Sequence, residues 1–222
     1  MSAPWSGLAE HLAWVDPWLL PLDASWSLPI SRLGAVASVL ALAMVGFNLR
    51  VNPMGWPLAI ASSALYALLF ARSRLYGEAA LQLVFIALSA WGWWQWLRGR
   101  DDGGQALQVR SLPPAGRWRL LGVTAALWLL IGAVLDAWTD SDVPYGDALP
   151  TAGSLVGQWL LACKWVDNWP CWLLVNVLSM ALFAHKGLWL TVGLYGAFAV
   201  LSCIGWRAWL RRLNVERWRG LP

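Results

Sequence analysis

The chain has 222 residues, of which 59% are hydrophobic and only 13% are charged, and its net charge is +4. A mean hydropathy of +0.54 and long uninterrupted apolar runs exclude an ordinary soluble globular domain. The composition therefore predicts an all-α integral membrane protein. We expect no nucleic-acid partner for it.

The first 29 residues lack the features of a cleavable signal peptide. They contain acidic residues and four prolines, and they have neither a basic start nor a continuous apolar stretch. Tryptophans are scattered through them, as in a segment lying at the membrane surface: Trp5, Trp14, Trp18 and Trp26. We expect residues 1–29 to be an interfacial segment.

A membrane-spanning helix needs about 20 mostly apolar residues. In chain order the sequence predicts seven spans, at about Ile30–Leu49, Met54–Phe70, Leu75–Leu97, Trp118–Trp138, Asp147–Cys163, Trp169–Ala184 and Leu188–Leu210. They divide the chain into a first three-helix repeat (30–97), a linker transmembrane helix (118–138) and a second repeat (139–210). The remaining segments are a long cytoplasmic loop (98–117) and a cytoplasmic tail (211–222).

Basic residues predict the orientation of these spans. Twelve of the 16 fall on one side: Arg50, Arg98, Arg100, Arg110, Arg117, Arg119, Lys164, Arg207, Arg211, Arg212, Arg217 and Arg219. The other side has four: Arg32, Arg72, Arg74 and Lys186. Because the side richer in Lys and Arg faces the cytoplasm, we expect a multi-pass protein of the inner (plasma) membrane. Its N-terminus would be outside and its C-terminus cytoplasmic.

Two tryptophan clusters recur 113 residues apart. Trp56-Pro57 returns as Trp169-Pro170, and the run GWWQWLR from Gly92 returns as GWRAWLR from Gly205. A single offset that holds without gaps over about forty positions indicates an internal duplication. Three helices reverse the direction of the chain and a fourth restores it. The two triplets are therefore predicted to be parallel copies in a 3+1+3 plan, with a site between them at the membrane midplane.

Ionisable residues are nearly absent from the predicted interior, which argues against ion coupling. The carboxamides of Gln82, Gln158 and Asn176 need partners or water in hydrocarbon. They either join helices or line a wet pocket, and residue type alone leaves both open. Glu78 and Asp147, near the outer ends of two spans, are weaker candidates for a substrate entrance. Both histidines lie outside the predicted core, so no metal or haem is expected.

One helix face carries the most specific pattern. Trp169 and Trp172 are three residues apart and Asn176 follows four residues later, so all three share a face. Aromatic planes beside a carboxamide suit a flat, polar, cationic heteroaromatic ligand through stacking and cation–π attraction.

At these residues the chain resembles the PnuC family of vitamin transporters, which move nicotinamide riboside and have relatives for vitamins such as thiamine. The resemblance runs from about Asn52 to Arg211. The run WGWWQW at Trp91–Trp96 is similar to the family's Y-G-W-Y-x-W. The segment KWVDNWPCWLLVNVLS, which starts at Lys164, is similar to the family's K-x-x-E-N-W-x-x-W-x-x-x-N-V-[IL]-S.

The resemblance implies seven transmembrane helices in a 3+1+3 plan of parallel repeats, similar to the full-length SWEET fold. It implies facilitated diffusion (uniport) of a dephosphorylated vitamin, driven by phosphorylation of the substrate by a cytoplasmic kinase. It also suggests a homo-oligomer, a trimer, within the lipid bilayer. No cofactor is implied.

The resemblance also assigns site residues. It places Gln82, Asn168, Trp169, Trp172 and Asn176 at the substrate and Asp147 at the entrance. The reasoning from residue types adds Gln158 to the substrate site and Glu78 to the entrance. The chain departs from the family pattern where it has Gly146 instead of Trp and Ser89 instead of Asn.

The departure at Ser89 leaves the identity of the vitamin open. Thiamine, also a flat cation, or another vitamin is the alternative substrate. A membrane enzyme would need a nucleophile with a base, or a metal set, inside the bundle, and the predicted spans offer neither. A packing or scaffold protein that binds none of these vitamins is the remaining alternative.

Overall fold

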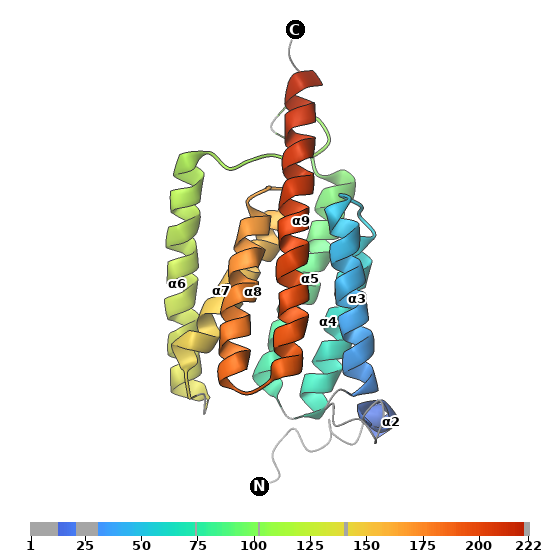
Figure 1. The fold of residues 1–222 in the computed structure, drawn as a ribbon, viewed down its shortest axis with the longest axis vertical. Coiled ribbons are helices and arrows are strands. Elements are labelled where there is room, and N and C mark those ends of the chain that lie inside the picture. Colours follow the sequence, from blue (N-terminus) through green and yellow to red (C-terminus); the bar gives the residue numbers. More distant parts are fainter. Residues whose placement is uncertain (1–12, 21–30, 74, 102, 140–141, 220–222) are drawn as a thin grey trace. The chain divides into compact units, whose positions relative to one another are not determined.

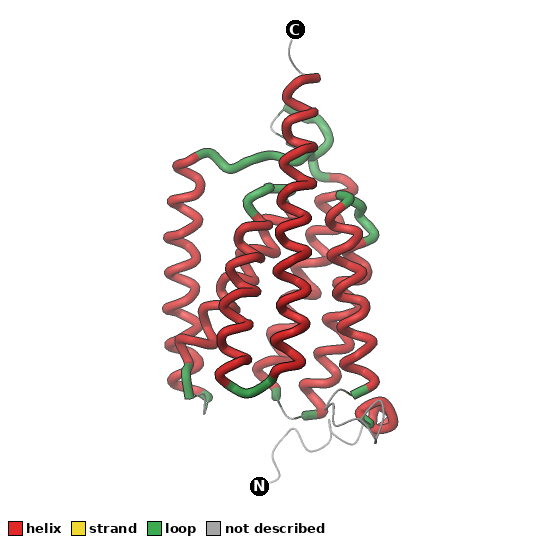
Figure 2. Tube along the Cα trace, in the orientation of Figure 1, coloured by secondary structure: helices red, strands yellow, loops and turns green. Residues whose placement is uncertain are grey.

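The computed structural model describes residues 13–20, 31–73, 75–101, 103–139 and 142–219. Within these ranges the regular structure is helical (Figure 2). Two isolated β-bridges pair Arg100 with Ala106 and Arg110 with Trp165. The long helices of the described ranges are α3 (Arg32–Leu49), α4 (Gly55–Arg72), α5 (Tyr76–Arg98), α6 (Pro114–Trp138), α7 (Pro144–Ala162), α8 (Asn168–His185) and α9 (Trp189–Arg219) (Figure 1). Each corresponds to one predicted span.

Some of these helices could span a membrane, and the chain divides into two compact units. In the described ranges, α3, α6 and residues Trp189–Val215 of α9 are long and apolar enough to cross a bilayer. The chain also forms two compact units, each described by itself below. The first contains the described residues up to 48 and those of 52–93, and the second contains residues 49–51 and the described residues from 94 onward.

Three helix ends lie beyond the ends of the predicted spans. Helix α6 begins at Pro114 rather than Trp118, and α7 begins at Pro144 rather than Asp147. Proline is well suited to the first helical position, where its missing N–H costs nothing, so α6 starts within the predicted loop 98–117 and α7 starts before the predicted fifth span. Helix α9 continues to Arg219, beyond the predicted end at Leu210. Most of the predicted tail is therefore helical, because hydropathy marks where a span ends and not where a helix ends.

The predicted interfacial segment is described only in part. It contains the short helices η1 (Ala13–Val15) and α2 (Asp16–Leu19), and Trp14 and Trp18 are exposed. Trp5 and Trp26 lie outside the described residues. Within the first unit, Arg72 at the end of α4 donates a 2.6 Å hydrogen bond to the Asp16 carboxylate, and this bond holds the pKa of Asp16 below its ordinary value.

The first unit is held together by buried contacts of α4 with its two neighbours. Ser62 donates a 2.8 Å hydrogen bond to the Ala37 carbonyl of α3. On the other side the buried Trp56 ring lies against Gly92 of α5. A Cβ atom at Gly92 would be only 2.4 Å from that ring, so glycine is required for this helix contact.

In the second unit α6 packs on α7, α7 on α8 and α8 on α9. Gly132 of α6 lies against the Tyr145 ring, and Gly157 of α7 lies against the Trp172 ring. Helices α8 and α9 meet at Trp169 and Gly205, where an added Cβ would again be 2.4 Å from the ring. Small residues that let backbones approach closely are typical of helix contacts in membranes.

The offset of 113 residues reappears in the local structure. Helices α4 and α8 have 18 residues each, and both ends are displaced by 113 positions. The turns before them each contain one non-glycine residue with positive φ, and Val51 and Lys164 both have φ 55°. These turns close with matching hydrogen bonds, from Asn52 N to Phe47 O at 3.0 Å and from Trp165 N to Leu160 O at 2.9 Å. The pairs Trp56–Gly92 and Trp169–Gly205 are a further equivalence. Two triplets of one design, α3–α5 and α7–α9, support the internal duplication.

Candidate functional site

The predicted aromatic residues lie on the first two turns of α8, in the second unit. Trp169 is 3% exposed, and its ring makes an edge-to-face contact with Trp209 of α9, with centroids 5.6 Å apart. Together with Gly205, this contact fixes the plane of the Trp169 ring. Among the described residues no acceptor reaches its indole Nε1–H, although this atom is buried. A buried indole N–H usually has a partner, so the site offers an unused donor to water or to a ligand.

Trp172 lies one turn further along and faces α7. Its ring lies against Gly157, where an ideal Cβ would be 3.1 Å from Cε2. Trp172 is half-buried, so part of the ring stays accessible. Gly157 is what allows the large ring to lie flat against α7.

Asn176 completes this face of α8. It is 5% exposed, and its Nδ2 donates a 3.2 Å hydrogen bond to the Ser202 hydroxyl of α9. Gln158 of α7 is equally buried. The structure thus brings Trp169, Trp172 and Asn176 onto one face, as their spacing predicts.

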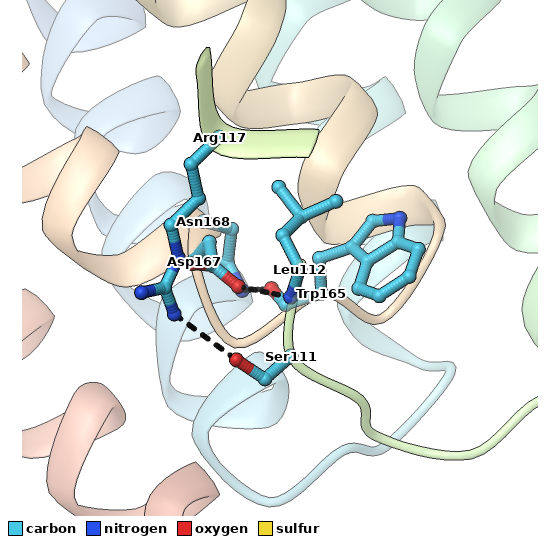
Figure 3. A network of polar contacts seen from close by, with 6 residues as sticks. All are labelled: Ser111, Leu112, Arg117, Trp165, Asp167 and Asn168. Carbon is cyan, nitrogen blue, oxygen red and sulfur yellow. Dashed lines mark hydrogen bonds and ion pairs between the residues drawn. The ribbon is translucent and has the colours of Figure 1, made fainter. Parts of the chain in front are cut away.

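The side chain of Asn168, which was predicted to contact the substrate, bonds instead to the turn before α8. It is completely buried, and its Nδ2 donates to the Trp165 carbonyl at 2.5 Å, which closes the turn before α8 (Figure 3). The nitrogen of this carboxamide therefore supports the turn, and its oxygen is a buried acceptor without a donor among the described residues.

The remaining predicted residues belong to other helices. Gln82 (half-buried) and Glu78 (exposed) lie on α5 and belong to the first unit. Asp147 at the start of α7 forms an ion pair with Lys186, at 3.0 Å. The entrance candidate is therefore a neutralised pair rather than an isolated negative charge.

Sequence reasoning missed a polar network at the start of α8 (Figure 3). Asp167 accepts hydrogen bonds from the Leu112 backbone N–H and from Arg117 Nε, both at 2.8 Å. Arg117 also donates to the Ser111 hydroxyl at 3.1 Å. A cavity of about 380 Å³ lies beside this network, with Trp206 in its wall. The available signal was the acidic residue directly before Asn168 in the Lys164 segment.

The connection between α5 and α6, which contains Ser111 and Leu112, is joined to the α7–α8 turn by backbone hydrogen bonds. Arg110 and the turn exchange two hydrogen bonds, from Arg110 N to Lys164 O at 3.1 Å and from Val166 N to Arg110 O at 2.8 Å. The Lys164 ammonium donates to the Leu107 carbonyl at 2.8 Å and lies 5.1 Å from the Trp96 ring centroid. The segment between α5 and α6 thus fixes the turn from which α8 starts.

These features define a class before any relative is considered. The described residues form long apolar helices, arranged in two similar triplets, with an aromatic and carboxamide face in the second. That is the make-up of a helical membrane protein built from two related three-helix repeats.

The comparisons with known proteins give the family. The family model described as nicotinamide mononucleotide transporter matches residues 31–211. The chain belongs to this family, the family of the PnuC vitamin transporters.

The sequence identities to individual relatives are low. The chain is 24% identical to the nicotinamide riboside transporter PnuC of Escherichia coli, with 89% of each chain covered. It is 27% identical to the riboflavin/roseoflavin transporter RibM of Streptomyces davaonensis, covering 80% of this chain and 84% of that protein. The fold is similar to the crystal structure of the vitamin B3 transporter PnuC, with a TM-score of 0.67 at 20% identity, over 93% of this chain and 87% of that one.

Proposed function

We propose that the protein transports nicotinamide riboside across the inner membrane by facilitated diffusion. The family and the Escherichia coli relative support vitamin transport. The observation that carries the proposal is the α8 face, where two tryptophans lie beside Asn176 and the Trp169 indole N–H has no intramolecular acceptor among the described residues. A pyridinium ring with a carboxamide and a ribose matches this face by cation–π attraction and hydrogen bonding.

In this proposal each residue has a specific role. Trp169 and Trp172 flank the pyridinium ring, while Gln158 and Asn176 hydrogen-bond the ribose or the carboxamide. Gln82 and the Asn168 oxygen are added to the site by the family resemblance. Asp147 with Lys186, and Glu78, remain proposed contacts at the outer entrance.

The mechanism we propose is a uniport without ion coupling. The α8 face holds neutral residues and no carboxylate that could carry a proton. Substrate then moves down its gradient, and phosphorylation by a cytoplasmic kinase keeps the gradient inward.

We further propose seven spans in the 3+1+3 plan similar to the SWEET fold, with the segment boundaries given above, and assembly as a trimer.

Transport in proteoliposomes tests the function directly. Uptake of labelled nicotinamide riboside should stop at equal concentrations on both sides and should be insensitive to collapse of a proton gradient. A nicotinamide riboside kinase with ATP inside the vesicles should then increase accumulation severalfold. Accumulation above the outside concentration without kinase would exclude uniport.

Another flat vitamin is the second candidate, and the RibM relative favours keeping it. Unlabelled thiamine and riboflavin should compete weakly with nicotinamide riboside. Stronger competition by either would transfer the substrate assignment to that vitamin while leaving the transporter class intact.

The role of Trp172 gives a prediction at residue level. Trp172→Ala should weaken nicotinamide riboside binding roughly thirtyfold, because a desolvated cation–π contact contributes about 2 kcal/mol. Calorimetry on the purified protein measures the change. Trp159→Ala is the matched control, since Trp159 of α7 is 42% exposed and outside the proposed site. Equal affinities for Trp172→Ala and wild type would remove Trp172 from the site.

A further inference from the structure

Ser202 of α9 is a buried hydroxyl with a defined hydrogen-bond direction. It is 3% exposed, and its Oγ donates to the Phe198 carbonyl one turn earlier at 2.8 Å. A serine hydroxyl carries one hydrogen, so after this bond its oxygen can only accept.

This commitment determines how the Asn176 carboxamide must lie. The group that faces Ser202 Oγ has to be a donor, and Asn176 Nδ2 occupies that position at 3.2 Å. Reversing the carboxamide would place Oδ1 against an oxygen that has no hydrogen to give. The Oδ1 atom is consequently held on the side away from Ser202.

We infer that Ser202 is a positioning residue that makes Asn176 a fixed hydrogen-bond acceptor and so selects substrates with a donor at that point. The inference rests on the proposed function. A ribose hydroxyl can reverse its direction, but a carboxamide –NH₂ only donates. The substrate's carboxamide –NH₂ is therefore the group that this arrangement recognises, and a carboxylate in its place is disfavoured.

The consequence is specificity for the amide over the acid form of the vitamin. With Ser202 in place, an acceptor-only carboxylate would meet the acceptor Oδ1 of Asn176. Without the hydroxyl, the Asn176 carboxamide is free to rotate and to present Nδ2 to a carboxylate. Loss of Ser202 should therefore change the two affinities in opposite directions.

The experiment compares nicotinamide riboside with nicotinic acid riboside by calorimetry on the full-length purified protein. In Ser202→Ala the affinity for the amide should fall and that for the acid should rise, so that their ratio decreases about tenfold. Ser154→Ala is the matched control, because Ser154 Oγ makes the same kind of bond to the Pro150 carbonyl, at 2.7 Å, on α7. In Ser154→Ala the ratio of the affinities for the amide and the acid should equal that of the wild type.

A second pair of variants covers the case in which Ser202→Ala does not fold. Ser202→Thr and Ser202→Val have the same shape and differ in the hydroxyl, and only the Thr variant should keep the wild-type ratio. If removal of the hydroxyl lowers both affinities by one factor, Ser202 is merely structural and the inference is wrong while the proposed function stands. If the wild-type protein binds no nicotinamide riboside, the proposed function and the inference both fail.

Discussion

Single glycines decide whether the tryptophan rings can occupy their places. Gly92 and Gly205 lie against Trp56 and Trp169, and in each case an added Cβ would approach the ring to 2.4 Å. Gly205→Ala should therefore destabilise the protein by about 1–3 kcal/mol through overpacking, and Gly92→Ala by a similar amount. Melting temperatures in detergent measure the effect.

The chain supplies matched controls for this prediction on the same two helices. Gly77 of α5 and Gly193 of α9 have nothing within 4 Å of an added Cβ. Alanine at either position should be neutral or slightly stabilising, because alanine is the better helix former. If Gly205→Ala melts at the temperature of Gly193→Ala, the close contact with Trp169 does not exist.

At the residue scale the sequence predicts which side chains share one face of a helix, but not which residues of other segments they contact. The spacing of Trp169, Trp172 and Asn176 is sufficient to place them together. It cannot reveal that Asn168 turns back to the Trp165 carbonyl, since that depends on the turn before α8. Ser202 was missed because a serine in an apolar helix most often only assists packing.

Among the elements, the connection between α5 and α6 has the clearest mechanical role. It is attached to the α7–α8 turn through Arg110, Lys164 and Asp167, and Asp167 is only 12% exposed. The turn needs support because Lys164 has φ 55°, a conformation that non-glycine residues seldom adopt. This attachment fixes the start of α8 and with it the first turn of the proposed site.

Removing Asp167 tests that role. Asp167→Ala deletes the acceptor of the Leu112 and Arg117 bonds, so the connection should open more often. Trypsin cleavage after Arg110 should accelerate roughly tenfold, because hydrogen bonds to charged groups contribute about 1.5–3 kcal/mol before solvent screening of the half-exposed Arg117. Gln108→Ala, at an exposed position of the same connection, is the control. Cleavage at equal rates in both variants would show that Asp167 does not hold the connection.

The helices themselves were predictable from hydropathy, because each apolar run is about the length of a span. Their ends were less so. Pro114 and Pro144 start helices earlier than the apolar runs begin, and α9 continues into a segment rich in arginine. The attachment of residues 107–112 to the turn at Lys164 has no periodic signature, since it consists of backbone hydrogen bonds between segments far apart in sequence.

At the scale of the whole molecule, the duplication makes a prediction about topology. Helices α3–α5 and α7–α9 are two similar triplets, and an odd number of helices reverses the direction of the chain. Helix α6 between them restores it, so the two triplets would run in the same direction and the ends of the chain would lie on opposite faces of the membrane. The excess of arginine around the α5–α6 connection and in the last turns of α9 predicts that those segments face the cytoplasm.

Labelling of single cysteines tests this arrangement. In a variant without the native cysteines, Thr139→Cys, between α6 and α7, should react with a membrane-impermeant maleimide from outside intact cells. Gln105→Cys, between α5 and α6, should react only after the membrane is opened. Both positions are exposed, so a difference in labelling reports the side of the membrane rather than burial. Labelling of both from the same side would mean that α6 does not cross. The two triplets would then be inverted copies, and a transporter built from parallel repeats would be excluded.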